Sequence, residues 1–166
     1  MRRIIKPAEL HGKHTAALAR WLLGKVLVRV DDNGQSEHVI TEVEAYHTEK
    51  DLACHASKGR TKRTEVMYQS GGRWYVYLCY GVHEMLNLVT GPENHPSAIL
   101  IRGVANIAGP GRLTKRLGIG RGLNNLLAAP TCGLHLEDHG IVVDYAGKFW
   151  AAKPWRFQYD HRPHVF

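Results

Sequence analysis

Strand-like patterns dominate the chain and predict a sheet. Runs rich in β-branched and aromatic residues, bounded by turn residues, predict strands at residues 25–30, 38–46, 74–80, 86–90, 98–104 and 141–145. The Asn33-Gly34 pair between the first two runs is a strong signal for a β-hairpin. Several connections are tight turns, so we expect a largely antiparallel arrangement of the strands.

Helical patterns are fewer and short. Residues 15–23 carry an apolar stripe and are followed by a glycine, which predicts a helix. We expect a second short helix at residues 64–68, and a third after the glycine-rich turn that opens residues 109–119. The fold class is therefore mixed α/β (α+β), with a curved, largely antiparallel β-sheet and short surrounding helices. The length fits a single domain at residues 1–166.

Composition is typical of a globular protein in a reducing compartment. Hydrophobic residues make up 44% and charged residues 22% of the chain, which argues against disorder. No run of about 18 apolar residues occurs and the N-terminus lacks a signal-peptide core, so we expect no membrane association. Cys54, Cys79 and Cys132 are too scattered for a disulfide framework. We therefore expect a cytoplasmic protein, nucleoid-associated if the cell is prokaryotic, and otherwise a nuclear one.

Positive charge is concentrated in two parts of the chain. The formal net charge is +7, and residues 94–136 contain no acidic residue. The basic residues of that stretch include Arg102, Arg112, Lys115, Arg116 and Arg121, and an earlier cluster contains Lys58, Arg60, Lys62 and Arg63. Such clusters form either ordinary solvated faces or two flanks that contact nucleic-acid phosphates. On the second interpretation the candidate DNA-backbone contacts are Arg60, Arg63, Arg112 and Lys115.

The strand predicted at residues 38–46 carries an unusual pair of acids. Period-two alternation predicts an apolar face formed by Val39, Thr41, Val43 and Ala45. The opposite face then presents Glu42, Glu44 and Tyr46. Glutamate is depleted in strands, so two of them at i and i+2 either decorate an exposed sheet face or serve a site.

Tyrosines gather in the same half of the chain. Five of the seven lie between Tyr46 and Tyr80. Tyr75 and Tyr77 share one strand face, whereas Tyr80 falls at the strand end beside Gly81. Aromatic strand residues usually pack in a core, but tyrosines flanked by basic residues can also stack on unpaired bases.

Several short motifs follow one another along the chain in a recognisable order. They are Glu44-Ala45-Tyr46, His55, Tyr75-Val76-Tyr77 with Tyr80-Gly81, Asn87, Arg102, the run at residues 109–119 and the ending KPWRFQYDHRPHV. This series resembles the alkyladenine (3-methyladenine) DNA glycosylase family over nearly the whole chain. The combination of motifs in register is highly specific, although no single motif would be.

The resemblance implies a base-excision repair enzyme. Such an enzyme flips alkylated or deaminated purines out of duplex DNA and hydrolyses the N-glycosidic bond, leaving an abasic site. Glu44 is similar in position to the family's general base, and Arg102 to the arginine that helps hold the same water. A carboxylate suits this reaction because it accepts a proton from water and stabilises positive charge on the sugar. Glu42 has no such role, and we expect its substitution to be far milder.

The resemblance also implies a pocket for the flipped base. Tyr46, His55 and Tyr77 would sandwich the base, and stacking would offset part of the cost of flipping. Asn87 would collide with the exocyclic amine of guanine and so reject that base. Tyr80 is similar to the wedge that fills the gap left in the base stack.

Metal-ligating patterns are incomplete. The HLEDH run at residues 135–139 has two histidines four apart but no evident third ligand, and HRPH at residues 161–164 is equally weak. We therefore expect no metal and no cofactor, and a monomer that binds double-stranded DNA containing damaged purines. Two rival functions stay open: a non-catalytic nucleic-acid-binding module, and a metal-dependent nuclease built around HLEDH.

Overall fold

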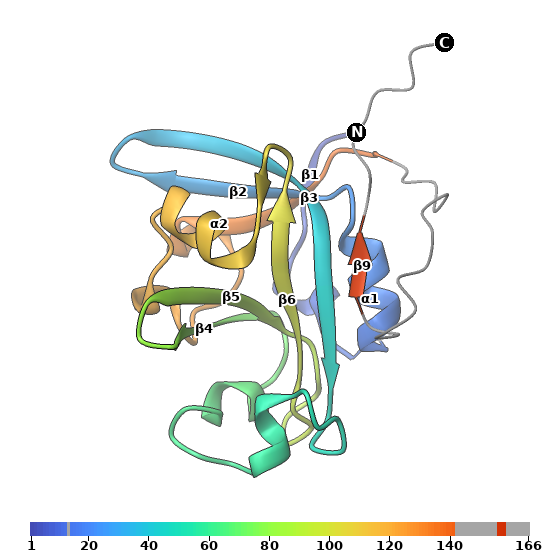
Figure 1. Cartoon of the computed structure of the whole chain (residues 1–166). Coiled ribbons are helices and arrows are strands. Elements are labelled where there is room, and N and C mark those ends of the chain that lie inside the picture. The colour runs from blue at the N-terminus through green and yellow to red at the C-terminus, as the bar shows by residue number, and fades with distance from the viewer. Residues whose placement is uncertain (13, 142–155, 159–166) are drawn as a thin grey trace.

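Strands and short helices alternate along the part of the chain that this computed structural model describes, residues 1–12, 14–141 and 156–158 (Figure 1). The strands are β1 (Arg3–Ile4), β2 (Val26–Asp31), β3 (Gly34–His47), β4 (Arg73–Cys79), β5 (His83–Val89), β6 (Ser97–Val104), β7 (Ile107–Ala108), β8 (Leu134–Asp138) and β9 (Arg156–Gln158). The helices are α1 (Thr15–Leu22) and α2 (Pro110–Arg116), with the 3-10 helices η1 (Pro7–Leu10), η2 (His55–Lys58), η3 (Glu65–Tyr68), η4 (Arg121–Leu123) and η5 (Pro130–Cys132).

Within the described residues the nine strands form one open sheet. Hydrogen-bonded neighbours follow the order β1-β8-β2-β3-β6-β5-β4, with β7 beside β6 and β9 beside β3. All of these pairings are antiparallel. The long strand β3 joins the two halves of the sheet, because its first half pairs with β2 and its second half with β6 (Figure 1). The predicted mixed α+β class is therefore confirmed.

Most of the predicted elements are present with slightly different bounds. The helices predicted at residues 15–23 and within residues 109–119 are α1 and α2, and the one at residues 64–68 is the 3-10 helix η3. Of the strand predicted at residues 141–145, only Ile141 is described, and it lies outside any strand. The other four residues lie outside the described part of the chain. The sheet also contains β1, β7, β8 and β9, which the hydrophobic pattern did not predict.

The β2–β3 hairpin is present, and its turn spans Asp31 to Gly34, the predicted DDNG run that contains the Asn-Gly pair. Asp31 pairs with Gly34, so Asp32 and Asn33 form the loop. The Asn33 N–H donates to Oδ1 of Asp31 at 2.8 Å. Gly34 has a φ of +106°, an angle that favours glycine, so the glycine is required at the first position of β3.

A β-bulge in β3 changes which residues face the core. The register against β6 shifts twice between Ile40 and Val43. Ile40, Val43 and Ala45 are buried in the apolar core, whereas Val39 and Thr41 are only partly buried. The predicted apolar face is therefore right for Val43 and Ala45 and wrong for Val39 and Thr41, because the alternation assumed an unbroken strand.

The main core lies between one face of the sheet and the two α-helices, α1 and α2. The core side chains come from alternate strand positions and include Val43, Ala45, Trp74, Val76, Leu86, Leu88, Ile99 and Ile101, with Leu18 and Leu22 from α1 and Leu113 from α2. Trp74 is fully buried, and its Nε1 donates to the backbone oxygen of Leu134 at 2.9 Å. No helix in the described residues is long and apolar enough to span a membrane.

The opposite face of the sheet is partly covered by the segment that joins β3 to β4 and contains η2 and η3 (Figure 1). A second, smaller core forms there, in which Val66, Met67 and Tyr68 pack near Tyr75 and Ala98. This arrangement leaves the polar side chains of β3 and β6 next to a cluster of aromatic rings.

Candidate active site

Strand register brings the predicted site residues that lie in strands β3 to β6 onto one face of the sheet. Tyr75 on β4 pairs with Asn87 on β5. Asn87 pairs in turn with Leu100 on β6, which pairs with Glu44 on β3. Side chains two positions apart on a strand share a face, so the same face also carries Tyr46, Tyr77 and Arg102. Residues from four strands are thereby gathered around one place.

Glu44 is a buried carboxylate with both oxygens hydrogen-bonded. Its Oε1 accepts from the Tyr46 hydroxyl at 3.0 Å, and its Oε2 accepts from Nη1 of Arg102 at 2.8 Å. The arginine supplies the opposite charge that a buried carboxylate requires. Each carboxylate oxygen has two lone pairs, so both oxygens can still accept a hydrogen bond from water. The structure thus brings Glu44 and Arg102 into direct contact.

Glu42 is a second buried carboxylate, and it shares Arg102 with Glu44. Nε of Arg102 donates to Oε1 of Glu42 at 2.9 Å. Arg156 of β9 also forms a hydrogen-bonded ion pair with this oxygen. The sequence pattern places Glu42 beside Glu44 on a polar face. It gives no signal for Arg156, because pairing between β3 and β9 joins segments that are far apart in the chain.

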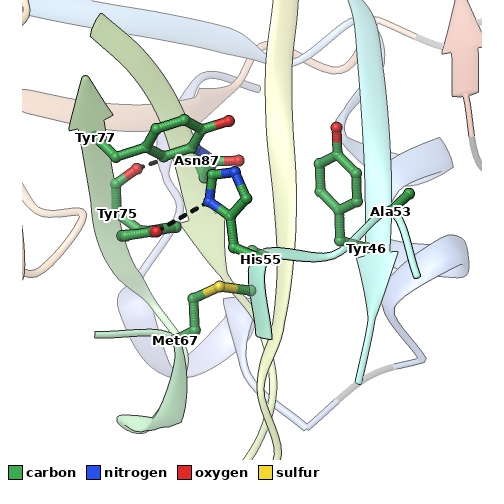
Figure 2. A pocket seen from close by; sticks show the side chains of 8 residues that line it. Tyr46, Ala53, His55, Met67, Tyr75, Tyr77 and Asn87 are labelled. Carbon is green, nitrogen blue, oxygen red and sulfur yellow. Dashed lines mark hydrogen bonds between the residues drawn. The ribbon is translucent and has the colours of Figure 1, made fainter. Parts of the chain in front are cut away.

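An aromatic pocket lies beside Tyr46 (Figure 2). It is lined by Tyr46, Ala53, His55, Met67, Tyr75, Tyr77, Asn87 and Ala98, which include all four predicted base-pocket residues. His55 comes from η2, and its Nδ1 lies 3.2 Å from the hydroxyl of Tyr75. Figure 2 shows Tyr46 on the other side of the pocket from His55 and Tyr77. Tyr75 was not among the predicted pocket residues, although it shares a strand face with Tyr77 and could have been inferred from that pattern.

The geometry of the pocket decides which rings could stack on a base. Its free volume is about 30 Å³, which holds about two water molecules and much less than a purine. A stacked base needs two walls about 7 Å apart, twice the contact distance between carbon atoms. His55 and Tyr77 have ring centroids only 4.2 Å apart. A base therefore cannot lie between His55 and Tyr77 as they stand, whereas Tyr46 faces this pair from the other side of the pocket.

Burial keeps the rings of the pocket uncharged near neutral pH. Burial, with Arg63 and Lys58 nearby, lowers the pKa of His55 below its ordinary value of 6.5. Burial also raises the pKa of Tyr77 to about 12 and raises the pKa of Tyr46 well above its ordinary value. Neutral aromatic faces attract cations, so these walls suit a positively charged ligand.

Asn87 presents a fixed amide to the pocket. Its Nδ2 donates to the backbone oxygens of Tyr75 at 3.2 Å and of Met85 at 3.3 Å. Both amide hydrogens are used in this way, so the side chain offers a ligand its Oδ1 acceptor. The residue is 2% exposed and cannot move far aside.

Tyr80 projects from the tip of the β4–β5 hairpin. Its side chain is 96% exposed, which excludes a core role, and the neighbouring Val82 is 72% exposed. Tyr80 and Gly81 have φ angles of +49° and +70°, and the Val82 N–H donates to the Cys79 oxygen at 3.1 Å. These values describe a tight turn in which a tyrosine holds a left-handed conformation that only glycine adopts without cost.

The predicted backbone contacts differ in how free their charges are. Arg112 and Lys115 are exposed on α2. Arg63 is exposed as well, although it lies over the Tyr77 ring and donates to the oxygen of Leu78 at 2.9 Å. Arg60 instead forms a two-point ion pair with Glu65, with distances of 2.8 and 2.6 Å. Its role in DNA contact stays a prediction, since a carboxylate already balances its charge.

A second cavity, of about 320 Å³, lies next to the aromatic pocket. Tyr77 lines both, and the other lining residues of the second cavity are Lys62, Arg63, Val76, Leu78, Arg121 and Asn124. Arg121 is paired with Glu84 at 3.1 Å, so Lys62 and Arg63 supply the positive charge that suits an anionic ligand. Lys62 and Arg121 belong to the two basic stretches of the sequence but were not among the predicted contacts.

The HLEDH run lies in β8 and His139, and its polar side chains centre on Glu137, while Nδ1 of His135 is buried without a hydrogen-bond partner. Glu137 accepts hydrogen bonds from Arg2 at 2.6 Å, and its oxygens lie 3.2 and 2.9 Å from ring nitrogens of His135 and His139. Burial alone would raise the pKa of Glu137, but these hydrogen bonds outweigh it and lower the pKa to about 2. No group of side chains suited to a metal ion occurs among the described residues. HRPH lies outside them.

Comparison with known proteins gives a consistent result. The sequence profile of the methylpurine-DNA glycosylase family matches residues 9–108. A protein of Psychrobacter cryohalolentis is 39% identical over 97% of this chain and 93% of its own length. A protein of Methanocella arvoryzae is 38% identical (97% and 95%), and one of Legionella pneumophila is 39% identical (99% and 98%). All three carry the name "Putative 3-methyladenine DNA glycosylase". The chain therefore belongs to the methylpurine-DNA glycosylase family of DNA repair enzymes.

Proposed function

We propose that this DNA glycosylase takes an alkylated or deaminated purine into the pocket beside Tyr46 and hydrolyses its N-glycosidic bond with a water activated by Glu44. The observation that carries the proposal is a buried carboxylate held by Arg102 and Tyr46 at the edge of an aromatic pocket. A surface that only bound DNA would gain nothing from this carboxylate, because its charge repels phosphate.

For an alkylated purine the reaction needs few groups, because the damaged base is already a good leaving group. Alkylation at N3 or N7 makes the purine cationic, so it can depart with the electron pair of its bond to the sugar C1′. The water oxygen forms the new bond to C1′, and Glu44 accepts the proton that the water loses. The same carboxylate stabilises the positive charge that develops on the sugar. The products are the free base and an abasic site.

The walls of the pocket fit such a base electrostatically. A cationic base between Tyr46 and the His55–Tyr77 pair would gain a cation–π contribution, and a neutral His55 would not repel it. The hydrogen bond between His55 and Tyr75 would hold the imidazole edge in place. Because the free volume is small, the walls must part when the base enters, which adds a cost for every base, damaged or normal.

Tyr80 is the candidate wedge. Flipping a nucleotide leaves a gap in the stack, and an aromatic ring that fills the gap offsets part of the unstacking cost. An exposed tyrosine at a hairpin tip can enter duplex DNA without moving the sheet. The strained backbone at Tyr80 supports this role, since strain that persists at an exposed position points to a function.

The DNA backbone would run past the hairpin and the second cavity. The hydroxyl of Thr114 on α2 donates to the backbone oxygen of Glu84 at 2.8 Å, so Arg112 and Lys115 lie near the hairpin. Arg63 and Arg121 border the second cavity beside Tyr77. Phosphates on either side of a flipped nucleotide would therefore meet basic side chains from two segments.

A base-release assay on methylated duplex DNA tests the proposal and separates its rivals. The enzyme should release free methylated purines and leave strands intact until the abasic sites are cleaved by alkali. A protein that binds damaged DNA but releases no base would be the non-catalytic module. Direct strand cleavage that depends on added metal would be the nuclease.

A further inference from the structure

A chain of ion pairs connects β9 to the catalytic carboxylate. Arg156 pairs with Glu42, Glu42 accepts from Nε of Arg102, and Nη1 of Arg102 reaches Glu44. The chain ends at the hydroxyl of Tyr46, which donates to the other oxygen of Glu44. The side chains of Glu42 and Glu44 are 9% and 10% exposed, so these contacts are made largely out of water.

We propose that Glu42 and Arg156 are positioning residues that hold Arg102 in the orientation in which it bonds a single oxygen of Glu44. This proposal rests on the proposed function only in taking Glu44 as the catalytic group. A guanidinium is planar and has five N–H donors in a fixed fork. Anchoring its Nε on Glu42 fixes the plane of the fork and directs one Nη toward Glu44.

Without Glu42, Arg102 would be free to grip both oxygens of Glu44. Arginine and carboxylate prefer such two-point pairing. That geometry would fill Oε1, which already accepts from Tyr46, and would leave one lone pair in place of two for a reacting water. Glu42 prevents this two-point pairing because it accepts the hydrogen bond from Nε of Arg102.

Arg156 balances the second carboxylate. Glu42 and Glu44 carry two negative charges, and Arg102 alone could neutralise only one of them. With Arg156 removed, Glu42 would draw Arg102 away from Glu44. Among the described residues, the ionisable groups around Glu44 are Glu42 and Tyr46 from β3, Arg102 from β6, Arg156 from β9 and, farther off, Tyr77 from β4.

β9 is anchored well enough to hold Arg156 beside Glu42. Its residues pair with β3, with Phe157 opposite Val43 and Arg156 opposite Glu44. Phe157 packs against the main core, and the guanidinium of Arg20 lies 4.8 Å from the centre of its ring. The segment thus docks on the free edge of the catalytic strand, outside the residues 9–108 that the family profile matches.

The test compares Glu42→Gln and Arg156→Met with the wild type in single-turnover base release across a range of pH. Glu37→Gln is the matched control, since Glu37 lies on the same strand and pairs with Arg2 away from the site. Both site variants should release base about tenfold more slowly while binding lesion DNA with a similar Kd.

The pH profiles distinguish positioning from a merely structural role. Loss of the negative charge at Glu42 should move the acid limb of the rate profile to lower pH, and loss of the positive charge at Arg156 should move it to higher pH. In the double variant Glu42→Gln with Arg156→Met, the acid limb of the rate profile should lie close to its wild-type pH, while the rate of base release stays low. Arg156→Lys should recover part of the lost rate.

Rates within about twofold of wild type, or slow rates with unshifted acid limbs in both single variants, would overturn the proposal. If Glu42→Gln does not fold, Arg156→Met and Arg156→Lys carry the test, because the Arg156 side chain is 44% exposed. Failure of the proposed function would look different, since Glu44→Gln would then keep its activity whatever the Glu42 and Arg156 variants do.

Discussion

Replacing Tyr80 by glycine and by alanine separates the stability of the hairpin from its function. The side chain is 96% exposed, so removing it gives up almost no buried surface. The φ of +49° costs a non-glycine residue roughly 1 kcal/mol. Tyr80→Ala keeps that strain and should change the free energy of unfolding by less than about 0.5 kcal/mol.

Tyr80→Gly should instead raise the free energy of unfolding, by up to about 1 kcal/mol, because glycine relieves the strain. For a chain of this size that corresponds to an increase in Tm of roughly 2–4 °C. A more stable protein that repairs DNA more slowly is the combined signature of a wedge.

Base release should slow equally in both variants. Losing a stacking contact worth about 1–3 kcal/mol predicts a defect of roughly fivefold to 150-fold on a fully paired lesion. The defect should shrink when the lesion is mismatched or single-stranded, because less stacking must be broken. Thermal unfolding and single-turnover release on the two substrates measure these effects, with Val30→Ala as a control at an exposed position of another hairpin.

Two results would refute this reasoning. One is a loss of about 3 kcal/mol or more in either variant, as expected for a buried aromatic residue. The other is an equal relative defect on paired and unpaired lesions.

Three further predictions concern metal, DNA contact and pH. Base release should survive exhaustive EDTA treatment, and activity restored only by zinc or magnesium would contradict this. Arg112→Ala and Lys115→Ala should each reduce the slope of log K against log salt by up to about 1, for damaged and undamaged DNA alike; unchanged slopes would mean that α2 faces away from DNA. Burial would raise the pKa of Glu137, but hydrogen bonds from His139, Arg2 and His135 lower it from 4.5 to about 2. Its stabilising effect, on the order of 3 kcal/mol, should therefore be present at pH values well above 4.5 and be lost as the pH falls toward 2. Glu137→Gln should flatten this part of the stability curve in thermal unfolding.

Periodicity predicted the sheet because most strands are half-buried and alternate regularly. The prediction failed locally at Val39 and Thr41, where a bulge adds a residue and reverses the faces. It also missed β8, whose histidine and acids suggested a metal motif. In the structure His135 and Glu137 form one buried pair on the polar side of that strand, while Leu134 and Leu136 enter the core.

The candidate site was predictable as a set of residues but not as a geometry. The motifs named Glu44, Arg102 and the pocket rings, and the sheet register gathers them as expected. The contacts of Glu42 and Arg156 come from a strand pairing that no local pattern encodes. Charge alone likewise could not reveal that Arg60 is already paired within its own segment.

The most direct measurement is the single-turnover rate of base release by Glu44→Gln on a duplex with one methylated purine. Asp32→Asn, an equal loss of charge in the exposed β2–β3 loop, is the control. We predict that Glu44→Gln lowers the rate by about 10²–10⁴-fold and leaves lesion binding equal or tighter, because a charge that repels phosphate is gone. Release at more than about a tenth of the wild-type rate would remove Glu44 from the role of base and contradict the account.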